Sequence, residues 1–354
     1  KQAVMEVLDS GWLGLGPKTA QFEKEFAAYL GVNNCVALNS CTAALDMALR
    51  VFGIGQHDKV LVPTMTFVST AHAVLYNNAM PVFVDCDDSL QFDIEDMANK
   101  VDAQTKAVVV VHYGGAVNSN IDYIRNFCDA RDLILIEDCA HAAGASLEGR
   151  KAGTFGDAAC FSFHAVKNLA AGDGGALVVD SQRATRAKKL RWLGIDKGTW
   201  DRTANNREYW WEYKVDEIGY KNHPCDILMS IALGQLTRLD DMNAKRRMLK
   251  KEYEEQLKDV DHIDIIKTDE ESACHLIVAV ADKRDLLADY LKRCNVSTGV
   301  HYKPIHLYDC YGNTPVLPNA EKMFKKILTL PTYYDLEKKD VSVICSYIKD
   351  FYKG

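Results

Sequence analysis

Several patterns that mark common protein classes are missing from this 354-residue chain. No apolar run reaches the roughly 20 residues that a membrane-spanning helix needs, and no signal-peptide pattern opens the sequence. No long basic run occurs and the formal net charge is −7, so we expect neither a membrane nor nucleic acid as a partner. Because the chain begins at Lys1, without a methionine and already inside a helical pattern, we also expect natural residues ahead of it.

Cysteine is not scarce, but its spacing lacks two informative patterns. The eleven cysteines are irregularly spaced, which is not how a disulfide framework looks in a chain of this length. No C-x-x-C pair occurs, which disfavours a structural zinc site, and we expect no metal. Free cysteines of this kind favour a reducing compartment, so we predict a cytoplasmic protein.

The glycine pattern of a nicotinamide-binding sheet is also absent. No G-x-G-x-x-G follows the first expected strand. The glycine-rich stretch at residues 172–175 comes after a lysine instead of at a strand-to-helix turn near the start. A nicotinamide-dependent enzyme is therefore a weak alternative.

Regular alternation of strands and helices fills the first 190 residues of the chain. Short apolar runs separated by helical patterns predict a mostly parallel sheet with right-handed crossovers. With 48% hydrophobic residues, the chain can bury a large core and a smaller second one. We expect a large domain with an N-terminal segment over residues 1–240, and a linking helix with a small C-terminal α/β domain over 241–354.

The expected C-terminal elements are less regular. A charged helix should link the two domains over residues 240–265, with its charges on an exposed face. Beyond it we expect strands near 276–280 and 298–301, and helices near 286–294, 320–327 and 341–352. A solvated helix and loop is the plain account of the charged stretch 183–211, although its four tryptophans also fit a nucleotide or partner-subunit surface.

Lys167 stands in an unusual setting for a lysine. It ends a Ser-Phe-His-x-x-Lys run between the apolar segments AACFSF and ALVV, which read as buried strands. Burial lowers the pKa of an amine, and a neutral lysine can attack an aldehyde to form an imine. A lone lysine after a strand is more often a surface residue, so Lys167 is not diagnostic by itself.

Asp138 supplies a partner for this lysine. The run ILIED at residues 134–138 has the form of a buried parallel strand that carries a carboxylate at its C-terminal end. In pyridoxal phosphate (PLP) chemistry a lysine holds the aldehyde and an acid keeps the pyridine nitrogen protonated. An aspartate at a strand end is more often a cap or turn residue. The evidence for PLP chemistry is therefore the combination of Lys167 and Asp138, and neither residue is diagnostic alone.

Six segments of the chain carry a family resemblance. The sequence is similar to the DegT/DnrJ/EryC1/StrS family of PLP-dependent nucleotide-sugar aminotransferases, from Gly11 to about Leu336, in GWLGLGPKTAQFEKEFAAYLGV, NSCTAALDMAL, VLVPTMTFVSTAHAVLYNNAMPVFVDCD, IEDCAHAAGA, FSFHAVKNLAAGDGGALVV and VSTGVHYKPIHLY. The resemblance implies an aspartate-aminotransferase-like fold of type I, PLP as cofactor, and a homodimer with shared active sites.

The resemblance also implies roles in cofactor binding. It gives Lys167 and Asp138 the catalytic roles described above. It assigns six further side chains to the phosphate, the ring face, the phenolic oxygen and the neighbouring subunit's cofactor: Cys41, Thr42 and Ser162; Phe67; His141; and His223. A helix cap or a packing aromatic would be the ordinary account of several of these. The family commonly has glycine where Cys41 stands, and asparagine or arginine where His223 stands.

Four residues are implied at the substrate side. By the same resemblance they lie near the sugar or at the mouth of the site, although each could equally be a packing residue: Trp12, His164, His301 and Tyr302.

The implied reaction is amino transfer from glutamate to a nucleotide-linked sugar. One branch of the family has histidine in place of the lysine and is a dehydratase, and this chain has the lysine. Members that act at C3 tend to carry an Asn-Ser-Arg string near Gly219, which is absent here. We therefore expect a 4-keto-6-deoxysugar as acceptor and a 4-amino-4,6-dideoxysugar nucleotide as product. A 3-keto aminotransferase and a non-catalytic nucleotide-sugar-binding PLP protein are the alternatives.

Overall fold

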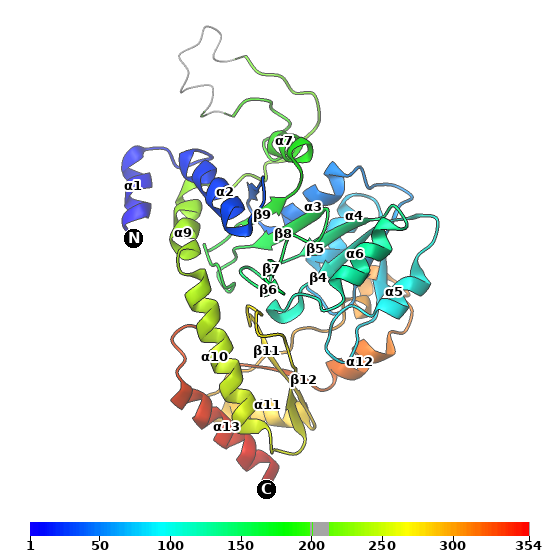
Figure 1. Ribbon diagram of the computed structural model, residues 1–354, viewed down its shortest axis with the longest axis vertical. Helices are drawn as coiled ribbons and strands as arrows, with labels where there is room; N and C mark the ends of the chain where they lie inside the picture. Colours follow the sequence, from blue (N-terminus) through cyan, green and yellow to red (C-terminus); the bar gives the residue numbers. More distant parts are fainter. Residues whose placement is uncertain (199, 201–211, 354) are drawn as a thin grey trace.

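The computed structural model describes residues 1–198, 200 and 212–353 of the chain. Two helices open it, α1 (Gln2–Ser10) and α2 (Pro17–Leu30), and each ends at a glycine with a positive φ. Both pack against α9 (Asp226–Leu236), as Figure 1 shows at the side of the large sheet. Phe22 and Phe26 of α2 are fully buried there.

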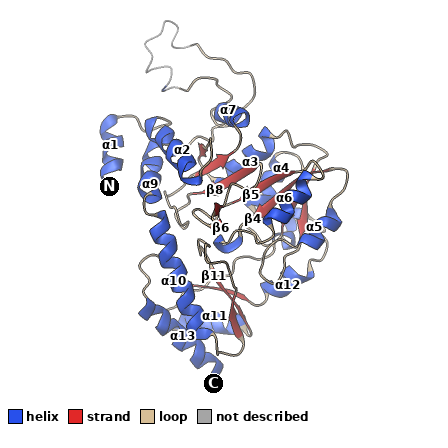
Figure 2. Cartoon of the chain, in the orientation of Figure 1, coloured by secondary structure: helices blue, strands red, loops and turns tan. Residues whose placement is uncertain are grey.

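A seven-stranded sheet forms the centre of the molecule (Figure 2). Its strands lie in the order β1-β9-β8-β5-β4-β2-β3, and only β9 runs antiparallel to its neighbours. The bounds are β1 (Val36–Leu38), β2 (Lys59–Pro63), β3 (Met80–Val84), β4 (Thr105–Val111), β5 (Ile134–Asp138), β8 (Ala158–Ser162) and β9 (Gly175–Val178). The prediction of a mostly parallel sheet is confirmed.

Helices cover both faces of this sheet. Along β2, Val60 and Val62 belong to one hydrophobic cluster and Leu61 to the other, because successive side chains point to opposite faces. One cluster contains residues of α3 (Cys41–Val51), α4 (Ser69–Tyr76) and α7 (Ser181–Leu190). The other contains residues of α2, α9 and α6 (Ile121–Asp129). The described part also includes α5 (Ile94–Lys100), η1 (Tyr113–Gly115) and the hairpin of β6 (Ser146–Leu147) and β7 (Arg150–Lys151).

A second, antiparallel sheet of three strands has its own core. Its order is β10-β11-β12, and a third cluster packs it against α10, α11 and α13. In Figure 1, α10 runs from the large sheet to this smaller one. The bounds are α10 (Leu239–Leu257), β10 (Ile263–Ile265), β11 (Ile277–Ala281), α11 (Arg284–Arg293), η2 (Ile305–Leu307), η3 (Asp309–Tyr311), α12 (Pro318–Phe324), β12 (Ile327–Leu330) and α13 (Lys338–Lys353).

The fold class is the expected one, and three local predictions need correction. The linking helix ends at Leu257, and β10 occupies residues expected to be helical. Residues 298–301 form only an isolated bridge, from Gly299 to Thr329, instead of a strand. The helix expected near 320–327 does not include Ile327. This residue begins β12 instead, because its apolar run is buried between β11 and the helices. The domain boundary at residue 240 stays a prediction.

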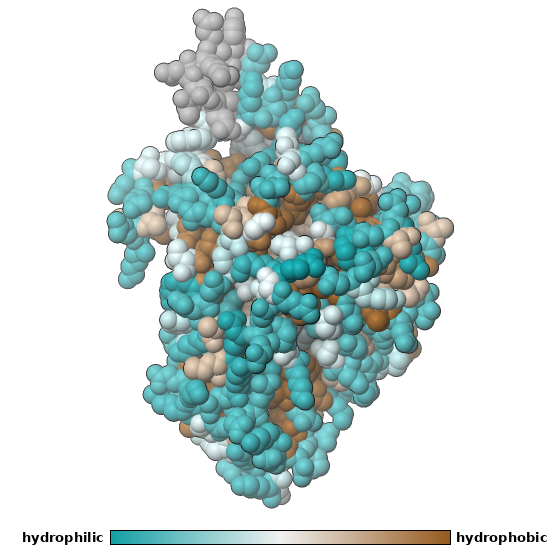
Figure 3. All heavy atoms as spheres, in the orientation of Figure 1, coloured by the Kyte–Doolittle hydropathy of each residue, from teal (hydrophilic) through white to brown (hydrophobic). Residues whose placement is uncertain are grey.

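The surface agrees with the burial of the apolar residues in the three clusters. The face shown in Figure 3 is mostly hydrophilic, with hydrophobic residues in smaller areas. Among the described residues, no helix combines the length and the apolar character that crossing a bilayer requires.

Gly175 offers a test of the packing between β9 and the start of α3. A Cβ atom at Gly175 would overlap the backbone of Ser40 and Cys41, so Gly175→Ala must push two backbones apart. We expect a loss of about 2 kcal/mol or more in the free energy of unfolding, measured by urea denaturation. The control is Gly234→Ala in α9, where a Cβ meets nothing within 4 Å and helix propensity should add about 0.5–1 kcal/mol. Equal stability of the two variants would contradict this packing account.

Candidate active site

A cavity of about 450 Å³ opens where parallel strands of the large sheet end. Asp138 and Ser162 are the last residues of β5 and β8, and Val111 is the last of β4. All three line the cavity, together with the first residues of α3 and α4. Ligands of open α/β sheets bind at this edge, because the loops that follow the strands meet there.

Lys167 points into this cavity from the loop between β8 and β9. As the sequence indicated, it lies between two buried strands, because β8 ends at Ser162 and β9 begins at Gly175. The chain then turns, with the Lys167 N–H donating to the His164 carbonyl (2.9 Å). Within the described residues the Lys167 amine has no hydrogen-bond or ion-pair partner. Burial lowers its pKa, although Cys41 and Asp138 act in the opposite direction. The amine is therefore poised toward its neutral, nucleophilic form.

Asp138 lies in the same cavity and is held by three donors. Its Oδ1 accepts from the Ala140 N–H (3.1 Å) and faces the Cys41 sulfur at 4.0 Å. Its Oδ2 accepts from the Thr70 hydroxyl (2.9 Å). Burial raises the pKa of Asp138, and these donors together with Lys167 oppose the rise. A buried acid with its donors in place can serve as a fixed negative charge at the floor of the cavity.

His141 presents a nitrogen without a partner. Its Nε2 lies 2.9 Å from the Tyr302 hydroxyl, and its ring stacks near His275 with centroids 4.5 Å apart. Burial lowers the pKa of His141 well below its usual value, so the ring is neutral. Nδ1, the other ring nitrogen, is buried and has no partner within the described chain. A ligand in the cavity would supply the partner that this nitrogen lacks.

Ten of the twelve predicted site residues line this cavity. They come from five separate parts of the chain: Cys41, Thr42, Phe67, Asp138, His141, Ser162, His164, Lys167, His301 and Tyr302. Phe67 is 57% exposed, so its ring is open to a ligand and not part of the core. The roles proposed for these residues stay predictions.

The other two predicted residues lie away from the cavity lining. Trp12 donates from its indole nitrogen to the Leu15 carbonyl (3.0 Å) and packs edge-on against Trp200. The His223 ring packs against Trp192, with centroids 4.6 Å apart. Of the four tryptophans at 183–211, Trp210 and Trp211 lie outside the described residues.

Sequence reasoning missed a buried clamp beside the lysine. Asn168 donates to Asn243 Oδ1 (2.7 Å) and to the Ala273 carbonyl (2.8 Å), and its own oxygen accepts from His275 Nδ1 (2.9 Å). Asn243 in turn donates to the Ala143 carbonyl (2.9 Å). The clamp ties the loop of the lysine to α10 and to the segment that leads into β11. In the sequence, the single indication that Asn168 holds this loop is its position directly after Lys167.

Sequence reasoning also missed Thr70, because a threonine at a helix start looks like a cap. In α4, however, no side-chain cap bond is formed. The Thr70 hydroxyl reaches Asp138 instead.

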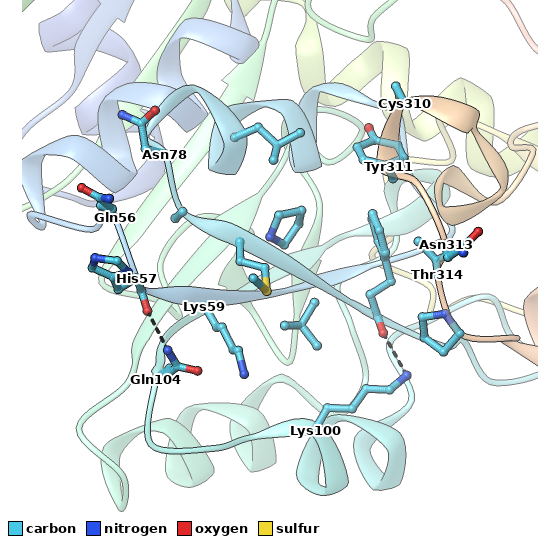
Figure 4. Close-up of a pocket in the computed structure, with 17 residues that line it drawn as sticks. Gln56, His57, Lys59, Asn78, Lys100, Gln104, Cys310, Tyr311, Asn313 and Thr314 are labelled. Carbon is cyan, nitrogen blue, oxygen red and sulfur yellow. Dashed lines mark hydrogen bonds between the residues drawn. The ribbon is translucent and has the colours of Figure 1, made fainter.

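A larger cavity of about 740 Å³ lies elsewhere, beside β3 (Figure 4). Its two lysines already have partners: Lys59 pairs with Asp102 at 2.5 Å, and Lys100 with Asp96 at 2.6 Å and with the Phe83 carbonyl at 2.9 Å. This cavity combines no acid with an unpaired amine among its lining residues. The chemistry therefore favours the cavity around Lys167.

A buried group of His112, Glu137 and Cys139 has spacing that could suit a metal ion. The Glu137 oxygens, however, accept from the backbone N–H groups of Gly153, Phe155 and Gly156 and from His112. The other nitrogen of His112 accepts from the Asn118 N–H at 3.1 Å. With these lone pairs used, the group acts as a structural support beneath Asp138.

The fold and the cavity define a PLP enzyme of fold type I. The model of the DegT/DnrJ/EryC1/StrS aminotransferase family matches residues 1–349, and the chain belongs to this family. It is 37% identical to the spore coat polysaccharide biosynthesis protein SpsC of Bacillus subtilis, over 100% of this chain and 94% of that protein. It is 35% identical to dTDP-4-dehydro-2,3,6-trideoxy-D-glucose 4-aminotransferase of Saccharopolyspora spinosa, over 97% and 91%.

Solved structures give the same result. The PLP form of the putative sugar aminotransferase Spr1654 from Streptococcus pneumoniae superposes with a TM-score of 0.90, at 27% identity, over 99% of this chain and 95% of that one. The protein is thus a PLP-dependent sugar aminotransferase. The cavity fits this cofactor, because it offers an unpaired amine, a buried acid and a histidine nitrogen that lacks a partner in the described chain.

The lowered pKa of Lys167 predicts how the stability of the apoprotein depends on pH. Between the lowered pKa and the usual 10.5, the unfolded chain binds more protons than the folded one, so stability rises with pH in that window. We expect Lys167→Met apoprotein to be more stable than the wild type near about pH 7. Its advantage should shrink as the pH approaches 10.5.

Urea denaturation of both apoproteins across this range measures the difference. Lys251→Met is the matched control, because the Lys251 side chain is 66% exposed. An advantage of Lys167→Met that grows with pH would contradict the account.

Proposed function

We propose that the protein transfers an amino group from glutamate to a nucleotide-linked 4-keto-6-deoxysugar and forms a 4-amino-4,6-dideoxysugar nucleotide. The observation that carries the proposal is the unpaired amine of Lys167 in one cavity with the buried carboxylate of Asp138. The 4-aminotransferase from Saccharopolyspora spinosa, at 35% identity, supports amination at C4. The absence of the Asn-Ser-Arg string near Gly219 points the same way.

The catalytic roles follow from the positions of the two residues. Bound PLP supplies an electron sink that stabilises negative charge at the carbon under reaction. Lys167 would hold the cofactor aldehyde at rest. Once the amino group of the donor has displaced it, the freed Lys167 amine would take the proton from the α-carbon of the donor, since its lowered pKa favours the free base. Asp138 keeps a proton on the ring nitrogen through its fixed negative charge. His141 Nδ1, which has no partner in the described chain, carries the ring proton in this proposal and donates it to the phenolic oxygen.

The remaining predicted residues take binding roles in this proposal. Cys41, Thr42 and Ser162 surround the phosphate position where α3 begins, and a helix start favours an anion there. Phe67 covers one face of the ring. His164, His301 and Tyr302 line the substrate side of the cavity.

We further propose a cytoplasmic homodimer with shared active sites. In this arrangement His223 reaches the cofactor of the neighbouring subunit, and Trp12 lies at the substrate mouth between subunits. This would account for the positions of both residues outside the cavity lining of a single chain.

Lys167→Ala tests the proposed reaction. The wild-type protein should absorb near ~420 nm and lose this band when glutamate is added, and it should aminate a 4-keto-6-deoxysugar carried on UDP, dTDP or GDP. Lys167→Ala should lower the turnover at least about a thousandfold, because the base is gone. Lys251→Ala, at an exposed lysine, is the control.

Mass spectrometry of the products identifies the acceptor. Undiminished transamination by Lys167→Ala would refute the assignment of the lysine. Amination of a 3-keto sugar in preference to the 4-keto sugar would overturn the choice of C4.

A further inference from the structure

A chain of hydroxyl groups reaches Asp138 from the segment around the start of α4. Thr66 precedes this helix and Thr70 lies in its first turn, and both line the cavity. The Thr70 hydroxyl lies 2.9 Å from Asp138 Oδ2, and the Thr66 hydroxyl lies 2.9 Å from that of Thr70. Thr66 is 2% exposed and Thr70 is 1% exposed, so neither group has ready access to water.

The direction of these hydrogen bonds follows from the inventory of donors. An ionised carboxylate accepts only, so the single hydrogen of the Thr70 hydroxyl goes to Asp138 Oδ2. The oxygen of Thr70 must then accept the hydrogen of Thr66. Two hydroxyls in series strengthen the last bond, because each polarises the next.

The two oxygens of Asp138 differ in their remaining capacity to accept hydrogen bonds. Oδ1 receives the Ala140 N–H and faces the Cys41 thiol, which can donate weakly. Oδ2 receives only the Thr70 hydroxyl from the described chain, which leaves this oxygen an open acceptor position. A ring N–H in the cavity would therefore find its acceptor on the oxygen that Thr70 orients.

The same turn of α4 also supports the phosphate side of the cavity. The Ser69 hydroxyl lies 2.8 Å from that of Thr42, at the start of α3. Neither Ser69 nor Thr70 caps its own helix. Two adjacent hydroxyls in the first turn of α4 thus contact two different parts of the cavity, Asp138 at the end of β5 and Thr42 at the start of α3. The helix α4 therefore connects these two parts.

We propose that Thr70, supported by Thr66, is a positioning residue that keeps Asp138 ionised and directs Oδ2 at the ring nitrogen of the cofactor. The proposal deepens the proposed function and rests on its assignment of Asp138. The burial of Asp138 favours its protonated form, and a protonated acid would lack the negative charge that strengthens a hydrogen bond from a ring N–H. The hydroxyl chain opposes this because it donates to the charged form.

Three variants separate the hydroxyl from the shape of the side chain. Thr70→Val removes the hydroxyl and keeps the volume, and Thr70→Ser keeps the hydroxyl and removes the methyl group. Thr66→Val breaks the chain one residue further from the acid. For each variant, the apoprotein is titrated with PLP to obtain the Kd, and the half-reaction of the loaded protein with glutamate gives a rate constant and an apparent KM.

For Thr70→Val we expect the Kd for PLP to rise about tenfold and the glutamate rate constant to fall about tenfold or more, which is the effect of one hydrogen bond to a charged group. The KM for glutamate should stay within about threefold, because the Thr70 hydroxyl is already engaged with Asp138 and Thr66. Thr70→Ser should recover both values to within about threefold, and Thr66→Val should lie between the wild type and Thr70→Val.

Three outcomes overturn the proposal: wild-type values for Thr70→Val, equal losses in Thr70→Ser and Thr70→Val, or a larger loss in Thr66→Val than in Thr70→Val. If Thr70→Val does not fold, Thr70→Ala replaces it and the same criteria hold. The PLP titration involves neither glutamate nor sugar. A wild-type protein that binds PLP but does not react with glutamate would therefore count against the proposed function, while the Kd values still decide the role of Thr70.

Discussion

The interaction on which the site depends is the electrostatic influence that a buried amine and a buried carboxylate exert on each other across one cavity, without forming an ion pair. Burial pushes Lys167 toward its neutral form and Asp138 toward its protonated form, and each residue opposes the shift of the other. The parallel sheet makes this interaction possible, because it brings the end of β5 and the loop after β8 to one edge. Ten of the predicted residues meet at this edge, although they come from distant parts of the sequence.

Buried polar contacts around the cavity hold the two groups in place. The Asn168 clamp fixes the loop next to the lysine, and the satisfied carboxylate of Glu137 fixes the strand next to the acid. In both cases a buried polar side chain has partners for its donors and acceptors. Such a side chain fixes one local arrangement of the backbone and leaves no buried polar group unpaired. Lys167 and His141 Nδ1, by contrast, line the cavity without a partner in the described part of the chain. This contrast distinguishes binding groups from supporting groups.

The sequence allowed the large sheet to be predicted, because short apolar runs alternate with helical patterns, and it marked Lys167 and Asp138 as candidates through their positions beside such runs. It did not show that residues 298–301 pair through a single bridge, or that Ile327 begins a strand. These features depend on tertiary contacts and not on local periodicity. Thr70 and Asn168 were missed for the same reason, since short polar side chains look like caps or turn residues until their distant partners are known.

The central claim, that the amine of Lys167 is the group that binds the cofactor aldehyde, can be measured directly. The PLP-loaded protein is reduced with borohydride to fix the bond between cofactor and protein, digested, and mapped by mass spectrometry. We predict the added mass on the peptide that contains Lys167, and its loss in the Lys167→Ala variant. Labelling of another lysine in the wild-type protein, or labelling that persists in the variant, would contradict the account.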